Sequence, residues 1–196
     1  MHRIFENRRH PVAVKLLITN VEILRLTPGL WMQIEEMNIF AEADRVFSEM
    51  APYIEESSYP LEKLHVFVYD SVIFKHLKLT SAKHIVFDRL DDDFDEVDGI
   101  LSVDDFMILI KRWISSEKQE GASFSFALFS PETYDEIEMD EFHKNVFKKI
   151  KKTFKKSISG HRYAQIPTNH GTMLKVSVEP GGEEENPWNI VMQILS

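Results

Sequence analysis

The order in which strand-like and helix-like segments follow one another is the feature that most constrains the fold of this chain. From Leu64 onward, short runs rich in β-branched and aromatic residues alternate with longer segments of helical periodicity. The strand-like runs are 64–69, 85–87, 99–101, 123–129, 161–166 and 173–178. The helix-like segments are 71–79, 102–117, 138–158 and 187–195. This alternation predicts an α/β (α+β) fold, in which the order strand–helix–strand–strand–helix occurs twice.

The residues before this region predict helices rather than strands. Apolar residues recur at helical spacing between Val12 and Leu26, and Pro28 with Gly29 would end that helix. A second helical stretch covers about Ala41 to Met50, and the polar piece from Glu55 to Pro60 predicts a linker. We therefore expect an N-terminal helical segment at 1–60, a first repeat at 61–118 and a second, degenerate repeat at 119–196.

Composition excludes several classes of protein. Hydrophobic residues make up 43% of the 196 residues, which is enough for a core, and the lack of cysteine excludes disulfides and thiolate metal sites. A net charge of -9 argues against a general nucleic-acid-binding protein. The sequence has no apolar run of membrane-spanning or signal-peptide length, so we expect a cytoplasmic protein without a membrane span.

The charges are unevenly distributed along the chain. The segment from Asp88 to Asp98 carries seven acidic residues against the single Arg89, whereas Lys144 to Lys156 carries seven lysines and no acid. The lysine run lies on a predicted helix, where it is either a solvated face or a docking site for an acidic partner, an anionic membrane or a calmodulin-like protein.

Ser102 and Asp105 form the sharpest local motif, and it has two interpretations. In the structural one, Ser102 caps the following helix and Asp105 favours the positive end of the helix dipole. In the functional one, a hydroxyl and a carboxylate at this spacing, between a strand and a helix, bind the hydroxyls of a ribose.

The second interpretation comes with a resemblance to a known family. The runs LHVFVYDSVIFKHL (64–77) and HIVFDRLDDDFDEVDGILSVDDFMILIKRW (84–113) are similar in order and character to cystathionine-β-synthase (CBS) domain proteins, or Bateman modules. Within that family they resemble the gamma subunit of AMP-activated protein kinase. The resemblance implies a non-catalytic regulatory module that binds AMP, ADP or ATP and acts through a protein partner, such as a kinase complex.

The resemblance also implies which residues would bind the nucleotide. Ser102 and Asp105 fall on the ribose-binding positions of the family, and Lys83 lies near its phosphate-contacting arginine. His161 and Arg162 match its phosphate-binding pair.

Two alternatives need no nucleotide. The acidic run resembles an irregular EF-hand calcium loop at 91–105, with Gly99 at the turn and carboxylate ligands from Asp91, Asp93, Asp98 and Asp105. The chain could also be a protein-interaction domain without any small-molecule ligand. Neither a phosphate-binding glycine loop nor a nucleophile turn occurs in the sequence, so we do not expect an enzyme.

Overall fold

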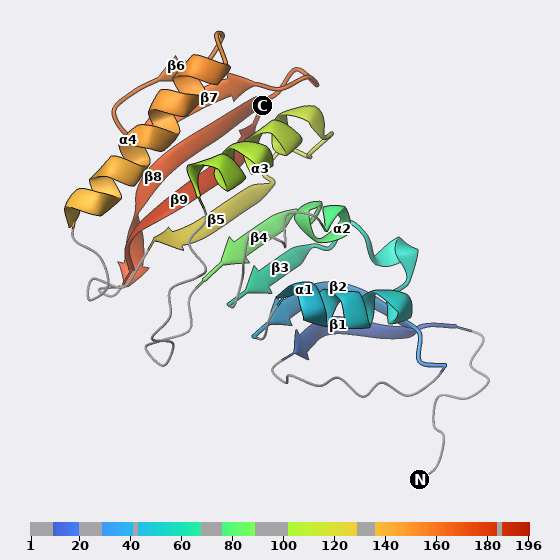
Figure 1. The fold of residues 1–196 in the computed structure, drawn as a ribbon. Coiled ribbons are helices and arrows are strands. Elements are labelled where there is room, and N and C mark those ends of the chain that lie inside the picture. Colours follow the sequence, from blue (N-terminus) through green and yellow to red (C-terminus); the bar gives the residue numbers. More distant parts are fainter. Residues whose placement is uncertain are drawn as a thin grey trace. The chain divides into compact units, whose positions relative to one another are not determined.

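The computed structural model describes residues 10–19, 29–40, 43–67, 76–88, 102–128, 136–183 and 186–196, which form a mixed α/β protein (Figure 1). The chain divides into two compact units. The described residues up to Ile85 belong to the first unit, and those from Val86 onward belong to the second.

Parallel strands form the first unit. The strands β1 (Val12–Thr19), β2 (Met32–Ile39) and β3 (Lys63–Val66) lie in this order and pair in parallel. The strand β4 (His84–Phe87), which begins in this unit, comes next in the order. Parallel pairing requires a crossover between successive strands. The helix α1 (Ala43–Met50) lies in the crossover from β2 to β3, and α2 (Leu77–Thr80) lies between β3 and β4 in the sequence.

The polar stretch that predicts a linker is instead packed against β2. Two short 3-10 helices, η1 (Ala51–Tyr53) and η2 (Glu56–Ser58), follow α1. The amide of Glu55 donates a hydrogen bond of 2.7 Å to the carbonyl of Met32. The hydroxyl of Ser58, which is buried, accepts a 3.0 Å bond from the amide of Ile34. These bonds satisfy backbone groups of β2 and make the stretch an integral part of the first unit.

The predicted N-terminal helix is wrong, because residues 12–19 form the strand β1. Their apolar spacing fits a helical stripe, but Val12, Val14, Ile18 and Thr19 are β-branched and favour an extended backbone. Parallel pairing with β2, for example Val14 with Ile34, gives every apolar residue of this segment a sheet neighbour. The strand β2 was not predicted at all. The helix predicted at about 41–50 is confirmed as α1.

The second unit is an antiparallel sheet covered by two helices on one face (Figure 1). Its helices are α3 (Val103–Ser115) and α4 (Glu136–Thr153). Its strands are β5 (Ser123–Leu128), β6 (Ile158–Ser159), β7 (Tyr163–Pro167), β8 (Met173–Glu183) and β9 (Asn186–Leu195). They lie in the order β5-β9-β8-β7-β6, and every pair is antiparallel.

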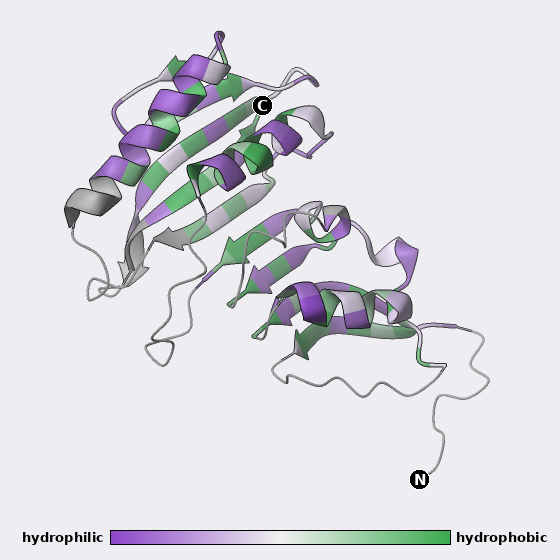
Figure 2. Ribbon diagram, in the orientation of Figure 1, coloured by the Kyte–Doolittle hydropathy of each residue, from purple (hydrophilic) through white to green (hydrophobic). Residues whose placement is uncertain are grey.

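The core of the second unit lies between this sheet and its two helices. Trp113 of α3 is 1% exposed, and Val146 and Ile150 of α4 are fully buried. The strands contribute alternate residues to the same core, and Figure 2 shows this alternation as green and pale bands along them. On β9, for example, Ile190, Met192 and Ile194 are buried.

The predicted pair of strand–helix–strand–strand–helix repeats is wrong. The last segment, predicted as a helix at 187–195, is the strand β9, which pairs with both β5 and β8. A proline in such a central strand removes a ladder hydrogen bond. Pro187 lies where the register between β8 and β9 shifts, between the pairs Pro180–Trp188 and Glu183–Asn186. The regular ladder is already interrupted at this position, so β9 tolerates the proline. After α4 the chain therefore makes four consecutive antiparallel strands and no closing helix.

The other predicted elements are confirmed where the structure describes them. The strands at 85–87, 123–129, 161–166 and 173–178 correspond to β4, β5, β7 and β8, and the helix from Ser102 corresponds to α3. The strand at 64–69 corresponds to β3, whose last predicted residues lie outside the described residues, as do most of the helix at 71–79 and the strand at 99–101. The helix predicted at 138–158 ends at Thr153, because Ile158 pairs with β7.

Candidate functional site

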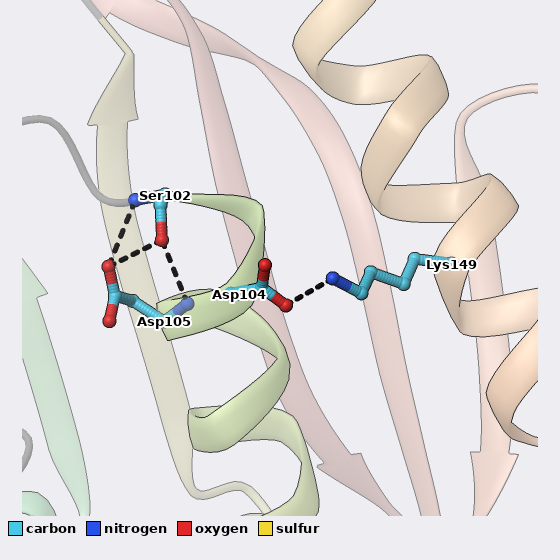
Figure 3. A network of polar contacts seen from close by, with 4 residues as sticks. All are labelled: Ser102, Asp104, Asp105 and Lys149. Atoms are coloured by element: carbon cyan, nitrogen blue, oxygen red, sulfur yellow. Dashed lines mark hydrogen bonds and ion pairs between the residues drawn. The ribbon is translucent and has the colours of Figure 1, made fainter.

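The N-terminus of α3 carries the motif that the sequence singled out. Ser102 is the N-cap residue, with an extended backbone, and forms a capping box with Asp105 (Figure 3). The hydroxyl of Ser102 accepts a 3.2 Å hydrogen bond from the amide of Asp105 and donates a 2.6 Å bond to its carboxylate. The same carboxylate oxygen, Oδ2, accepts the amide of Ser102 at 3.2 Å. These bonds satisfy two amides that the first helical turn leaves without partners.

The structural interpretation of Ser102 and Asp105 is therefore confirmed. The hydroxyl of Ser102 both donates and accepts within the box, and Oδ2 of Asp105 accepts two bonds. A ribose that bound here would have to compete for these atoms. Their proposed contact with a nucleotide stays a prediction.

An ion pair joins the first turn of α3 to α4. The ammonium of Lys149 contacts the carboxylate of Asp104, whose side chain is 78% exposed (Figure 3). An exposed pair of this kind contributes less than about 1 kcal/mol to stability. It shows that one lysine of the basic run already binds a carboxylate.

The remaining predicted phosphate ligands lie on other elements. Lys83 belongs to the first unit, where its ammonium lies 2.9 Å from the carboxylate of Glu62, a bond that holds the pKa of Glu62 below its usual value. His161 and Arg162 lie in the turn between β6 and β7, where both are exposed. The carbonyl of Arg162 accepts a bond from the amide of Val178. The turn stands at the β6–β7 end of the strand order, whereas Ser102 begins α3.

The predicted calcium ligands can be placed only in part. Asp91, Asp93 and Asp98 lie outside the described residues, and Asp105 is engaged in the capping box. Within the described ranges, no group of three or more histidine, aspartate or glutamate side chains is arranged to hold a metal ion.

The lysine run forms a basic face on α4 and the turn that follows it. Val146 and Ile150 share one side of the helix and point into the core, so the residues on the opposite side point outward. The exposed members of the run are Lys144, Lys148, Lys151, Lys152, Lys155 and Lys156. We call Lys148, Lys151, Lys152, Lys155 and Lys156 the lysine face. Figure 2 shows the outward side of α4 as largely purple.

The charge of the lysine face is not compensated by the residues that the structure describes. Within the part of the chain that the structure describes, none of its five ammonium groups forms an ion pair or a side-chain hydrogen bond. Cations in the last turn of a helix, here Lys151 and Lys152, interact favourably with the helix dipole. That interaction fades within one turn, so it does not account for the other lysines.

A polar network on β8 was not recognised in the sequence. Lys175, Ser177 and Glu179 alternate with buried residues and therefore share one side of the strand. The hydroxyl of Ser177 donates a 2.7 Å bond to the carboxylate of Glu179, and Lys175 donates one of 3.2 Å. The Ser177 bond, followed by the effect of Lys175, holds the pKa of Glu179 below its ordinary value. The alternation of apolar and polar residues over 174–179 was the signal available.

Comparison with known proteins assigns the chain to a family. No curated protein and no solved structure matches the chain. Among the described residues, no helix is long and apolar enough to span a membrane. Residues 1–130 match the family described as "Domain of unknown function (DUF3557)". That match covers well over half of the 196 residues and ends after β5, before the lysine face. The chain belongs to the DUF3557 family.

Proposed function

We propose that this chain is a non-catalytic, regulatory protein-interaction module that works in the cytoplasm without a small-molecule ligand. Its composition, which lacks cysteine, suits a reducing compartment. The function is exerted by binding a protein partner.

The capping box is the observation that carries this proposal. A ligand-binding hydroxyl and carboxylate need polar atoms that are free to meet the ligand, and those of Ser102 and Asp105 are largely used by their own helix. The other candidate ligands, Lys83 and the pair His161 and Arg162, are held on separate elements. The lysine face, in contrast, offers several charges that have no partner among the described residues.

Titration calorimetry of the full chain with AMP, ADP and ATP tests the proposal. We expect no heat of binding from any of the three nucleotides. Saturable heat that is lost in Asp105→Asn, but kept in the exposed control Asp104→Asn, would show that the motif is a nucleotide site and would overturn the proposal.

Calcium is tested separately by thermal unfolding. We expect the same melting temperature with calcium chloride and with a chelator. A melting temperature that rises with calcium and returns with chelator would instead support the EF-hand interpretation of residues 91–105, since a ligand that binds only the folded state stabilises it.

A further inference from the structure

The lysine face concentrates positive charge on a chain whose net charge is -9. Lys148 and Lys152 are four residues apart on α4, so they lie on the same side of the helix, about 6 Å apart along its axis. Lys151 flanks them, and Lys155 and Lys156 extend the charge into the turn before β6. Like charges at this spacing repel one another. A partner of opposite charge relieves that repulsion.

We propose that the lysine face binds an acidic segment of a partner protein. This inference rests on the proposed function, because it names the surface and the chemistry of the protein partner. The ion pair between Lys149 and Asp104 supports this inference, because a lysine of the same helix, next to the lysine face, already binds a carboxylate.

The overall charge favours a short acidic segment over a larger anionic surface. A nucleic acid or a membrane extends well beyond the lysine face and would meet the excess negative charge of the rest of the chain. A short peptide needs to contact only the lysine face. Because charges are screened over about 8 Å at physiological ionic strength, such a peptide is influenced mainly by the nearest lysines.

The spacing of the lysines suggests the pattern of the segment. Residues two apart on an extended strand lie about 7 Å from one another on the same side, which is close to the rise between Lys148 and Lys152. A segment in which acidic residues alternate with small polar ones would therefore place successive carboxylates against successive turns of α4.

Fluorescence anisotropy with a labelled peptide of alternating Glu and Ser tests the inference on the full chain. A peptide with Gln in place of Glu is the control for charge. We expect the Glu peptide to bind, and Lys148→Gln/Lys152→Gln to weaken binding by about tenfold, as expected for the loss of two exposed ion pairs. The matched variant Lys15→Gln/Lys63→Gln removes the same charge from β1 and β3, and it should bind like the wild type.

Competing polyanions separate the other outcomes. A single-stranded oligonucleotide, and phosphatidylcholine vesicles with or without phosphatidylserine, are compared at the same ionic strength. The inference would be overturned if the oligonucleotide or the vesicles bound more tightly than the Glu peptide and if Lys148→Gln/Lys152→Gln weakened that binding. This result would also overturn the choice of a protein partner. If neither the peptide nor these polyanions bind, the inference that the lysine face is a binding surface is overturned. The proposed function is not affected by that result, because the nucleotide and calcium titrations test it separately.

Discussion

The ammonium of Lys118 lies 4.7 Å from the centroid of the Trp113 ring, just beyond the end of α3. A ring face at this distance favours the charged ammonium. Burial has the opposite effect and dominates, because it lowers the pKa of Lys118 from 10.5 to about 8. The folded protein therefore holds this proton less tightly than the unfolded chain does.

The lowered pKa of Lys118 predicts a gain in stability at alkaline pH. Between about 8 and 10.5 the unfolded chain binds the proton that the folded chain has lost, so the free energy of unfolding rises with pH over this range. Below about 8 both states are protonated and the cost of burying the ammonium is fully present. The variant Lys118→Met has an uncharged side chain at this position and should lack this dependence of the free energy of unfolding on pH.

Urea unfolding of the wild type and of Lys118→Met across this pH range measures the effect. The wild type should become more stable relative to the variant as pH rises. Tyr59, whose pKa is raised to about 12 by burial and then by Glu56, lowers stability above pH 10 but does so equally in both proteins. A difference between the two proteins that stays constant with pH would contradict the prediction.

The capping box predicts a cost for Ser102→Ala. Removing the hydroxyl leaves the amide of Asp105 without its acceptor, which should lower the free energy of unfolding by about 1 kcal/mol. Ser102→Thr keeps a capping hydroxyl and should lose less. Equal losses in the two variants, measured by urea unfolding, would show that the cap does not stabilise α3.

The two isoleucines at the end of the lysine run distinguish the observed end of α4 from the longer helix that the sequence predicts. Ile150 is fully buried, whereas Ile158 lies in β6 and is 59% exposed. We expect Ile150→Val to cost about 1 kcal/mol and Ile158→Val to change stability by less than about 0.5 kcal/mol. Similar costs, measured by urea unfolding, would mean that both residues face the core.

The network on β8 predicts a loss of stability in acid. Because the pKa of Glu179 is lowered in the folded state, its contribution is present above the ordinary value of 4.5 and is lost as pH falls through the folded value. Ser177→Ala removes the larger cause of the lowered pKa and should flatten this part of the acid unfolding curve. Glu179→Gln should flatten it as well. A curve unchanged in both variants would exclude this network as a source of acid sensitivity.

Local sequence patterns were sufficient for α1, α3 and several strands. In α3, Ser102 with Asp105 predicts the start of the helix, and the apolar stripe that includes Phe106 and Trp113 predicts the buried side. The lysine run on α4 was recognised from its spacing with Val146 and Ile150. Local patterns were not sufficient for the candidate nucleotide site, because bringing Lys83, Ser102 and His161 together requires a particular arrangement of strands. The predicted arrangement was wrong.

The sequence by itself determined the capping of α3 and the charge of α4, since each depends on residues within a few positions of one another. Only the tertiary structure decided that 12–19 and 186–195 are strands. Their apolar residues fit a helical stripe and a sheet face alike. Pairing with β2 in one case, and with β5 and β8 in the other, fixes the extended backbone through hydrogen bonds to residues distant in the sequence.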